Sequence, residues 1–226
     1  MNLKMEAKRV LNGLCHLGPC SDIYMFHHVT LTPERDLSLK LDTDAFLRFL
    51  DRPHHYASLE QVMEDKTYGG QAALTFDDGL LDAYTVAYPA LRERKLPFTL
   101  FVTSRMVGKD GYLTLPQLQE LYADPLCTIG VHGTEHRVLT QVGETERREE
   151  IFDSKDELEQ MVGGPCDVFA YSHGCYDEEI LRMVEQAGYK AACAVAGRPL
   201  NRYFDRGPYA YPRHSVEEAT REMFRL

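Results

Sequence analysis

Residues 71–79 read Gln-Ala-Ala-Leu-Thr-Phe-Asp-Asp-Gly, a buried-strand pattern that runs into two aspartates and a glycine. Side chains of neighbouring strand residues point to opposite faces, so Asp77 and Asp78 reach one site only if the strand ends and the backbone turns there. Two carboxylates this close repel each other unless a cation neutralises one of them or one of them holds a proton. The pair therefore indicates a strand end beside a cation. A simple Asp-Asp-Gly surface turn is the alternative.

Strand-length apolar runs recur along the chain and alternate with segments of helical periodicity. We expect strands at residues 23–26, 72–76, 98–102, 127–131, 167–171 and 191–195. We expect helices at residues 80–94, 115–122, 144–161, 177–187 and 216–226, with Pro89 kinking or restarting the first. This alternation predicts parallel strands joined by helical crossovers, hence an α/β barrel or an open doubly wound sheet. In either architecture the site lies at the C-terminal ends of the strands.

Length and composition exclude several classes of protein. The 226 residues suit one domain spanning residues 1–226, and a net charge of −10 argues against a nucleic-acid partner. No apolar run approaches the roughly 18 to 20 residues that span a membrane. Residues 1–10 lack the apolar core of a secretory signal, so we expect a cytoplasmic protein. Six cysteines without Cys-x-x-Cys spacing indicate reduced thiols, and composition leaves the oligomeric state open.

Polar clusters follow four of the expected strands, always at the same end. The clusters are His27-His28, Asp77-Asp78, His132-Gly133-Thr134-Glu135-His136 and Ser172-His173. A lone His-x-x-x-His is common, and in a helix it only places two rings on one face. Beside a carboxylate pair, it indicates a two-His, one-Asp metal site with open coordination positions, as catalysis requires. A divalent ion there lowers the pKa of a water toward about 7 and polarises a carbonyl, which leaves the second carboxylate as general base.

Two of these motifs together resemble the polysaccharide deacetylases, the carbohydrate esterase family 4 or NodB-homology enzymes. They are Thr75-Phe76-Asp77-Asp78-Gly79 and the Ile-Gly-Val-His-Gly-Thr-Glu-His of residues 129–136, and the resemblance extends over residues 23–216. It implies a distorted (β/α)7-type barrel and a metal-dependent hydrolase that removes N-acetyl groups from an amino sugar or glycan. It also implies Asp77 as the base, and Asp78, His132 and His136 as ligands of zinc or of cobalt, nickel or iron.

Two further segments resemble the branch that de-N-acetylates poly-N-acetylglucosamine. Residues 25–29, Met-Phe-His-His-Val, match its Met-Tyr-His-like strand end, which implies His27 as general acid for the leaving amine. The alternative is that His27 or His28 is only a hydrogen-bonded residue at a strand end. Residues 211–213, Tyr-Pro-Arg, resemble the Leu-Pro-Arg segment of the branch. Since arginine can hold a carboxylate with two parallel hydrogen bonds, Arg213 is either the partner of Asp77 or a surface arginine.

The third motif departs from the family. Residues 169–176 read Phe-Ala-Tyr-Ser-His-Gly-Cys-Tyr, so Ser172-His173 replaces the Pro-Tyr that the branch usually carries in Ala-Tyr-Pro-Tyr-Gly. The resemblance implies that the backbone N–H of His173 helps to hold the oxyanion, a role that survives replacement of the side chain. The His173 imidazole itself is open to three roles: binding the metal, tuning a proton transfer, or fitting a different sugar.

Three functions remain open on the sequence. The first is a deacetylase of an N-acetylated saccharide. The second is a cytoplasmic deacetylase of a small or lipid-linked sugar precursor, favoured by the altered third motif and the missing export signal. The third is a non-catalytic carbohydrate-binding or scaffold protein on the same barrel, favoured by the altered third motif alone. Metal content combined with acetate release distinguishes the third from the other two.

Overall fold

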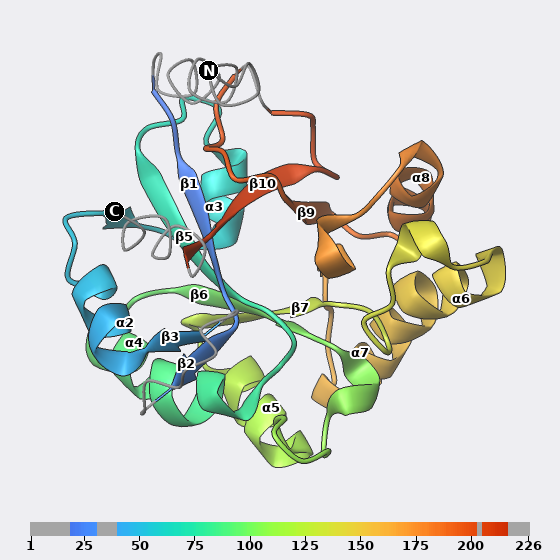
Figure 1. Cartoon of the computed structure of the whole chain (residues 1–226), viewed down its shortest axis with the longest axis horizontal. Helices are drawn as coiled ribbons and strands as arrows, with labels where there is room; N and C mark the ends of the chain where they lie inside the picture. The colour runs from blue at the N-terminus through green and yellow to red at the C-terminus, as the bar shows by residue number, and fades with distance from the viewer. Residues whose placement is uncertain (1–18, 31–39, 203–204, 217–226) are drawn as a thin grey trace, which may run out of the picture.

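Seven parallel strands close into a barrel in the computed structural model, which describes residues 19–30, 40–202 and 205–216. Around the barrel they are β1 (Asp22–Phe26), β10 (Tyr211–Ser215), β9 (Ala191–Val195), β8 (Val168–Ala170), β7 (Cys127–Val131), β6 (Phe98–Val102) and β5 (Gln71–Phe76). β5 pairs back onto β1 along the whole length of β1 and closes the ring. Figure 1 shows β1 and β10 side by side, although they come from opposite ends of the described chain. The predicted (β/α)7-type barrel is confirmed.

The barrel is distorted at β8, which has three residues and shares one registered pair with β7, Val131 with Phe169. By contrast, β6 and β7 share five pairs. Outside the barrel, β4 (His55–Tyr56) extends the edge of β5, and β2 (His28–Thr30) and β3 (Lys40–Asp42) form a separate two-stranded sheet. β8, which pairs little with β7, leads directly into residues 169–176, the segment that corresponds to the third motif.

All six expected strands are present, because strands buried on both faces read as continuous apolar runs. β6 is buried at every residue, and β5 is buried from Ala72 onward. β10 was not predicted: a proline normally argues against a central strand, and Arg213 is charged. The short strands β2, β3 and β4 were also missed, since two or three residues carry no readable period.

Helices surround the strands (Figure 1). They are α2 (Thr43–Leu50), α3 (Leu59–Glu64), α4 (Tyr88–Glu93), α5 (Leu115–Ala123), α6 (Glu144–Arg148), α7 (Ser154–Val162) and α8 (Glu178–Gln186), with 3-10 turns η2 (Ser104–Met106), η3 (Leu139–Gln141) and η5 (Ser172–Gly174). Pro89 lies in the first turn of α4 after a π-helical turn, η1 (Ala83–Ala87), so the predicted restart is confirmed. No helix in the described part of the chain is long and apolar enough to span a membrane.

The segment predicted as one helix over residues 144–161 is interrupted. A second π-helical turn, η4 (Glu149–Asp153), lies between α6 and α7. Such turns are rare and often occur at functional sites. The helix expected over residues 216–226 lies outside the described residues apart from Val216.

Aromatic side chains pack across the β1–β5 pair that closes the barrel. Phe26 and Phe76 stack at 5.1 Å between ring centroids across β1 and β5, and Phe46 and Phe49 of α2 contact Phe26 edge-on. Edge-on and offset arrangements suit the aromatic quadrupole. This packing fixes the C-terminal ends of β1 and β5 beside each other, directly before His27 and Asp77.

Candidate active site

The backbone turns sharply where β5 ends. Asp78 has φ 72° and Gly79 has φ 75°, the left-handed region that glycine tolerates and most other residues avoid. A Cβ on Gly79 would also stand 3.0 Å from Val102 Cγ1. Asp77 is only 2% exposed, and its backbone N–H donates to the Phe26 carbonyl at 2.9 Å. The Asp-Asp-Gly segment is therefore a strand end inside the barrel mouth rather than a surface turn.

Arg213 and Asp77 form a buried, bidentate ion pair. Arg213 Nη1 lies 2.6 Å from Asp77 Oδ1 and Nη2 lies 2.7 Å from Oδ2, and Arg213 is fully buried. Nη1 also donates to Thr75 Oγ1 at 3.2 Å, and the guanidinium carbon lies 5.1 Å from the centre of the Phe101 ring. Burial alone would raise the pKa of Asp77, but the Arg213 charge, with His132 next, holds that pKa well below its usual range. Asp77 is thus an ionised carboxylate at neutral pH.

Asp78, His132 and His136 form a cluster of potential metal ligands. One ligand atom from each lies within 4.8 Å of the others. Asp78 Oδ1 is 3.6 Å from His132 Nε2 and 3.4 Å from His136 Nε2. The opposite ring nitrogen, His132 Nδ1, donates to the Ala170 carbonyl at 2.8 Å, which directs Nε2 toward Asp78.

The chemistry of this donor set fits a divalent transition metal. Two imidazoles and one carboxylate are the protein ligands of many catalytic zinc sites, and they leave positions open. Burial lowers the pKa of His132 from 6.5 to about 4, although the carboxylates of Asp77 and Asp78 oppose the shift. His132 is therefore neutral above mildly acidic pH, the form in which an imidazole binds a metal.

The His132–His136 segment is an irregular loop and not a helix. Gly133 has φ 81° and His136 has φ 62°, so two left-handed residues fold the second histidine back toward the first. The two rings come to 4.7 Å between centroids. The alternative of a helical His-x-x-x-His with two rings on one face does not apply to this chain.

The two histidines after β1 have different surroundings. His28 Nδ1 lies 2.6 Å from Asp82 Oδ2, in a pair at the edge of the site. His27 lies close enough to Asp77 and to His173 for its charge to act on the pKa of each. The structure thus brings His27 near both Asp77 and His173 and leaves His28 in a strand-end hydrogen bond.

The third motif reaches the same cluster from β8. His173 has φ 58° and an exposed side chain, and its ring lies 4.5 Å from that of His136. Partial burial, with the nearby His136 next, lowers the pKa of His173. Ser172 is buried, and its Oγ donates to the His132 carbonyl at 3.5 Å. Within the described residues, His173 is a neighbour of the ligand cluster and not one of its three members.

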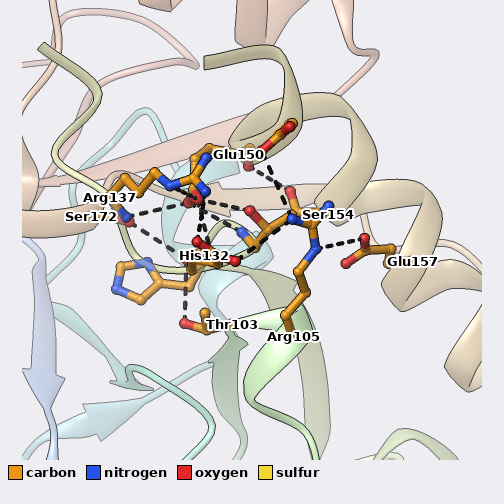
Figure 2. Close-up of polar contacts among 11 residues, drawn as sticks. Thr103, Arg105, His132, Arg137, Glu150, Ser154, Glu157 and Ser172 are labelled. Carbon is orange, nitrogen blue, oxygen red and sulfur yellow. Dashed lines mark hydrogen bonds and ion pairs between the residues drawn. The ribbon is translucent and has the colours of Figure 1, made fainter. Parts of the chain in front are cut away.

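The sequence patterns did not indicate Glu150, and they placed Thr75 in a motif without giving it a role. Thr75 Oγ1 accepts from Arg213, and Glu150 accepts from the loop between the two histidines. Glu150 is 1% exposed and accepts hydrogen bonds from the loop between His132 and His136 (Figure 2). A readable signal existed, because Glu150, Ser154 and Leu158 recur at a spacing of four and so share the apolar face of the predicted helix. A glutamate on such a face needs a partner when buried.

A cavity of about 330 Å³ opens at the opposite end of the barrel, where β7, β8, β9 and β10 begin. Its lining includes Thr128, Val168, Ala191 and Tyr211 and none of the clustered aspartates and histidines. In parallel α/β barrels the chemistry lies at the C-terminal ends of the strands. The Asp78, His132 and His136 end is therefore the candidate active site.

Fold and cluster together define a parallel α/β-barrel protein with a candidate metal centre at its strand C-termini. The family model for polysaccharide deacetylases matches residues 64–192, more than half of the chain. The chain belongs to the polysaccharide deacetylase family, and the family predicted from the motifs is confirmed.

Two curated proteins are similar to this chain in sequence. YxkH of Bacillus subtilis (strain 168) is 30% identical over 160 residues, which cover 71% of this chain and 56% of YxkH. SCO4760 of Streptomyces coelicolor is 31% identical over 118 residues, which cover 52% of this chain and 45% of that protein. The chain spans about half the length of the curated relatives that it matches.

Solved structures share the fold. The deacetylase PplD of Streptococcus pyogenes, in complex with acetate, matches with a TM-score of 0.78 and 22% identity, over 92% of this chain and 100% of that chain. IcaB of Ammonifex degensii matches with a TM-score of 0.76 and 21% identity, over 91% of this chain and 96% of that chain. At these identities the likeness extends to the barrel fold.

Proposed function

We propose that this chain is one deacetylase domain, a metal-dependent hydrolase that removes N-acetyl groups from an amino sugar or glycan. The observation that carries the proposal is that a possible metal site and a possible general base lie next to each other at the end of β5. A two-His, one-Asp ligand cluster stands beside a second aspartate that is buried and ionised. Hydrolysis of an amide needs both an activated water and a base to take its proton.

Asp78, His132 and His136 would hold the ion, with zinc as the first choice and cobalt, nickel or iron as alternatives. Such an ion supplies Lewis acidity, which polarises the acetyl carbonyl and makes a water acidic near neutral pH. Asp77 then takes the proton from that water. Because Arg213 lowers its pKa, Asp77 is a weak base, and it is suited to a water that is already acidified.

Three other groups complete the proposed mechanism. Arg213 fixes the plane of the Asp77 carboxylate through two hydrogen bonds. The backbone N–H of His173 donates to the oxyanion of the tetrahedral intermediate, as expected for the third motif. His27, which lies near Asp77 and His173, protonates the departing amine.

The test is acetate release by protein reloaded with zinc, cobalt or nickel. N-acetylglucosamine oligomers are the first substrates, since the family acts on polysaccharides. We expect metal-dependent acetate release with a 1:1 ratio of metal to chain. Stoichiometric metal without acetate release from any N-acetylated saccharide would refute the hydrolase and favour the non-catalytic carbohydrate-binding protein.

A second candidate keeps the chemistry and changes the substrate to a small or lipid-linked sugar precursor. The specific observation is His173, whose exposed imidazole stands beside His136 where the branch has Pro-Tyr. Comparing kcat/KM on monomeric, nucleotide-linked, lipid-linked and polymeric substrates decides between them. A clear preference for long polymer removes this second candidate.

A further inference from the structure

Glu150 is a buried carboxylate that no step of the proposed mechanism uses. It comes from the π-helical turn η4 and is 1% exposed. Figure 2 labels Glu150 among the polar contacts of this region. Its Oε1 accepts from Thr134 Oγ1 at 2.7 Å and from Glu135 N at 3.0 Å. Its Oε2 accepts from Thr134 N at 3.1 Å and from Arg137 N at 3.4 Å. These four bonds fill the acceptor capacity of a carboxylate.

The donors all belong to the segment 132–137, which carries His132 and His136. That segment is neither helix nor strand. The His132 N–H still donates to the Val102 carbonyl of β6 at 2.9 Å, but the N–H groups that follow it have no helix or strand partner. Successive N–H groups that converge on one anion form a nest, an arrangement usually found around bound phosphate or other anions. Here the anion is a side chain of the protein itself.

The carbonyl side of the same segment is also paired. Ser104 N donates to the Gly133 carbonyl at 3.0 Å, and Arg105 N donates to the Thr134 carbonyl at 3.2 Å. The segment is therefore held between the turn after β6 and the Glu150 carboxylate, as Figure 2 shows for the labelled residues.

Glu150 is itself fixed in place. Ser154 Oγ donates to the Glu150 carbonyl at 2.6 Å, and Tyr189 Oη donates to the neighbouring Ile151 carbonyl at 2.8 Å. Position 133 has no room for a side chain, because a Cβ there would collide with the Glu150 carboxylate. The carboxylate thus sits in a closed, rigid setting.

We propose that Glu150 is a positioning residue that folds the segment 132–137 into its metal-binding conformation before any metal arrives. It acts mainly through the backbone of the segment. Its carboxylate accepts from three backbone N–H groups and one hydroxyl, with the Arg137 Nε further away at 3.9 Å, and it contacts neither imidazole. A ligand loop ordered in advance loses less conformational freedom when it binds. The proposal rests on the metal site of the proposed function and does not require that the chain deacetylate anything.

Glu150→Gln is the test, with Glu149→Gln as its matched control. Glutamine keeps the shape but replaces one acceptor oxygen with an N–H2 donor, which then faces loop donors. Glu149 lies in the same turn and is also a glutamate. Within the described residues its carboxylate pairs with the Arg137 and Arg105 guanidinium groups and accepts no backbone N–H of the segment. We expect zinc affinity, measured by competition with a chromophoric chelator, to fall about 10- to 100-fold in Glu150→Gln and to stay near wild type in Glu149→Gln.

A second readout needs no metal. In metal-free wild-type protein the amides of Thr134, Glu135 and Arg137 should exchange slowly with deuterium. In metal-free Glu150→Gln they should exchange faster, while the amides of β7 keep their protection. A purely structural role would instead speed exchange in β7 and leave the metal affinity of the folded protein unchanged. The same affinity and the same loop exchange as wild type would overturn the proposal.

Thr134→Val covers the case in which Glu150→Gln fails to fold, because it removes one of the four hydrogen bonds and leaves the carboxylate in place. We expect a smaller loss of zinc affinity in the same direction, and wild-type affinity in this variant contradicts the proposal.

Wild-type protein that binds zinc but releases no acetate refutes the deacetylase and leaves the Glu150 role standing. Wild-type protein that binds no zinc overturns both.

Discussion

The barrel interior around Asp77 and the barrel rim around Asp78 are one residue apart in sequence and both lie near His132 Nε2, yet they differ in burial, backbone conformation and main partner. Asp77 is buried and is paired with a permanent cation, Arg213. Asp78 is partly exposed and faces two imidazoles, and its backbone has φ 72°. Two adjacent carboxylates are thus kept apart by a left-handed turn and directed to different partners. The mutual repulsion of the pair is met by an arginine on one side and, we propose, by a metal on the other.

Removing a rim ligand should have the largest effect. His132→Ala takes away one of the three proposed ligands, and the expected loss of zinc affinity exceeds the about 10- to 100-fold that a change outside the ligand set costs. Metal content after dialysis and acetate release should both disappear. Because the Asp77–Arg213 pair remains, circular dichroism should still report a folded barrel. Tight stoichiometric zinc in His132→Ala would mean that the rim cluster is not the metal site.

Asp77→Asn should separate the role of the barrel interior in catalysis from the role of the rim in metal binding. We expect acetate release to fall about 10²- to 10⁴-fold, the usual contribution of a general base, while zinc still binds at the rim. The asparagine also leaves the buried Arg213 charge without its counter-ion, which costs about 3–5 kcal/mol of stability. The double variant Asp77→Asn with Arg213→Met removes that unpaired charge and is the control. If either variant is folded, binds zinc and is nearly as active as wild type, Asp77 is not the base.

Arg213→Met tests the barrel interior through the pH dependence of activity and stability. Without the guanidinium, burial raises the pKa of Asp77, so the acidic limb of the kcat/KM profile should move to higher pH. In the wild-type protein the lowered pKa of Asp77 contributes to the free energy of unfolding. This contribution is complete above pH 3.8, the ordinary pKa of the group, and is lost only as the pH falls through the pKa of Asp77 in the folded state.

In Arg213→Met the sign of that contribution reverses. The folded carboxyl now binds its proton more tightly than the unfolded one, so the unfolding free energy should fall relative to wild type as pH rises from about 4 toward neutrality. Urea unfolding at several pH values measures this. Parallel pH curves for the two proteins would show that Arg213 does not control the Asp77 pKa.

His173 at the rim should give the smallest effect. His173→Ala keeps the backbone N–H, so we expect less than a tenfold change in kcat, with any larger effect confined to KM for the sugar. Alanine at φ 58° keeps the left-handed strain of roughly 1–2 kcal/mol that the histidine also carries, and His173→Gly is the control without that strain. A hundredfold fall in kcat in both variants would give the imidazole a direct part in proton transfer.

Much of the fold was readable because parallel strands buried on both faces produce apolar runs, and β5, β6, β7 and β9 match their predicted bounds closely. β10 was not readable. Its Tyr-Pro-Arg-His-Ser sequence looks like a turn, and only the pairing of β10 with β1 and β9 makes it a strand. The same pairing buries Arg213, which sequence alone left open as a surface arginine.

The sequence by itself determined the alternating α/β class, the residue types at the strand ends and the family, because strand burial and short motifs are local properties of the chain. The choice of a barrel over an open sheet came only through the resemblance to the family. Tertiary structure decided which groups share an environment. Asp77 pairs with an arginine that lies 136 residues away in sequence. The segment 132–137 donates hydrogen bonds to Glu150, which lies 14 residues beyond His136 in a π-helical turn. Such pairings depend on burial, which makes an unpartnered charge costly, and no local pattern records which partner relieves that cost.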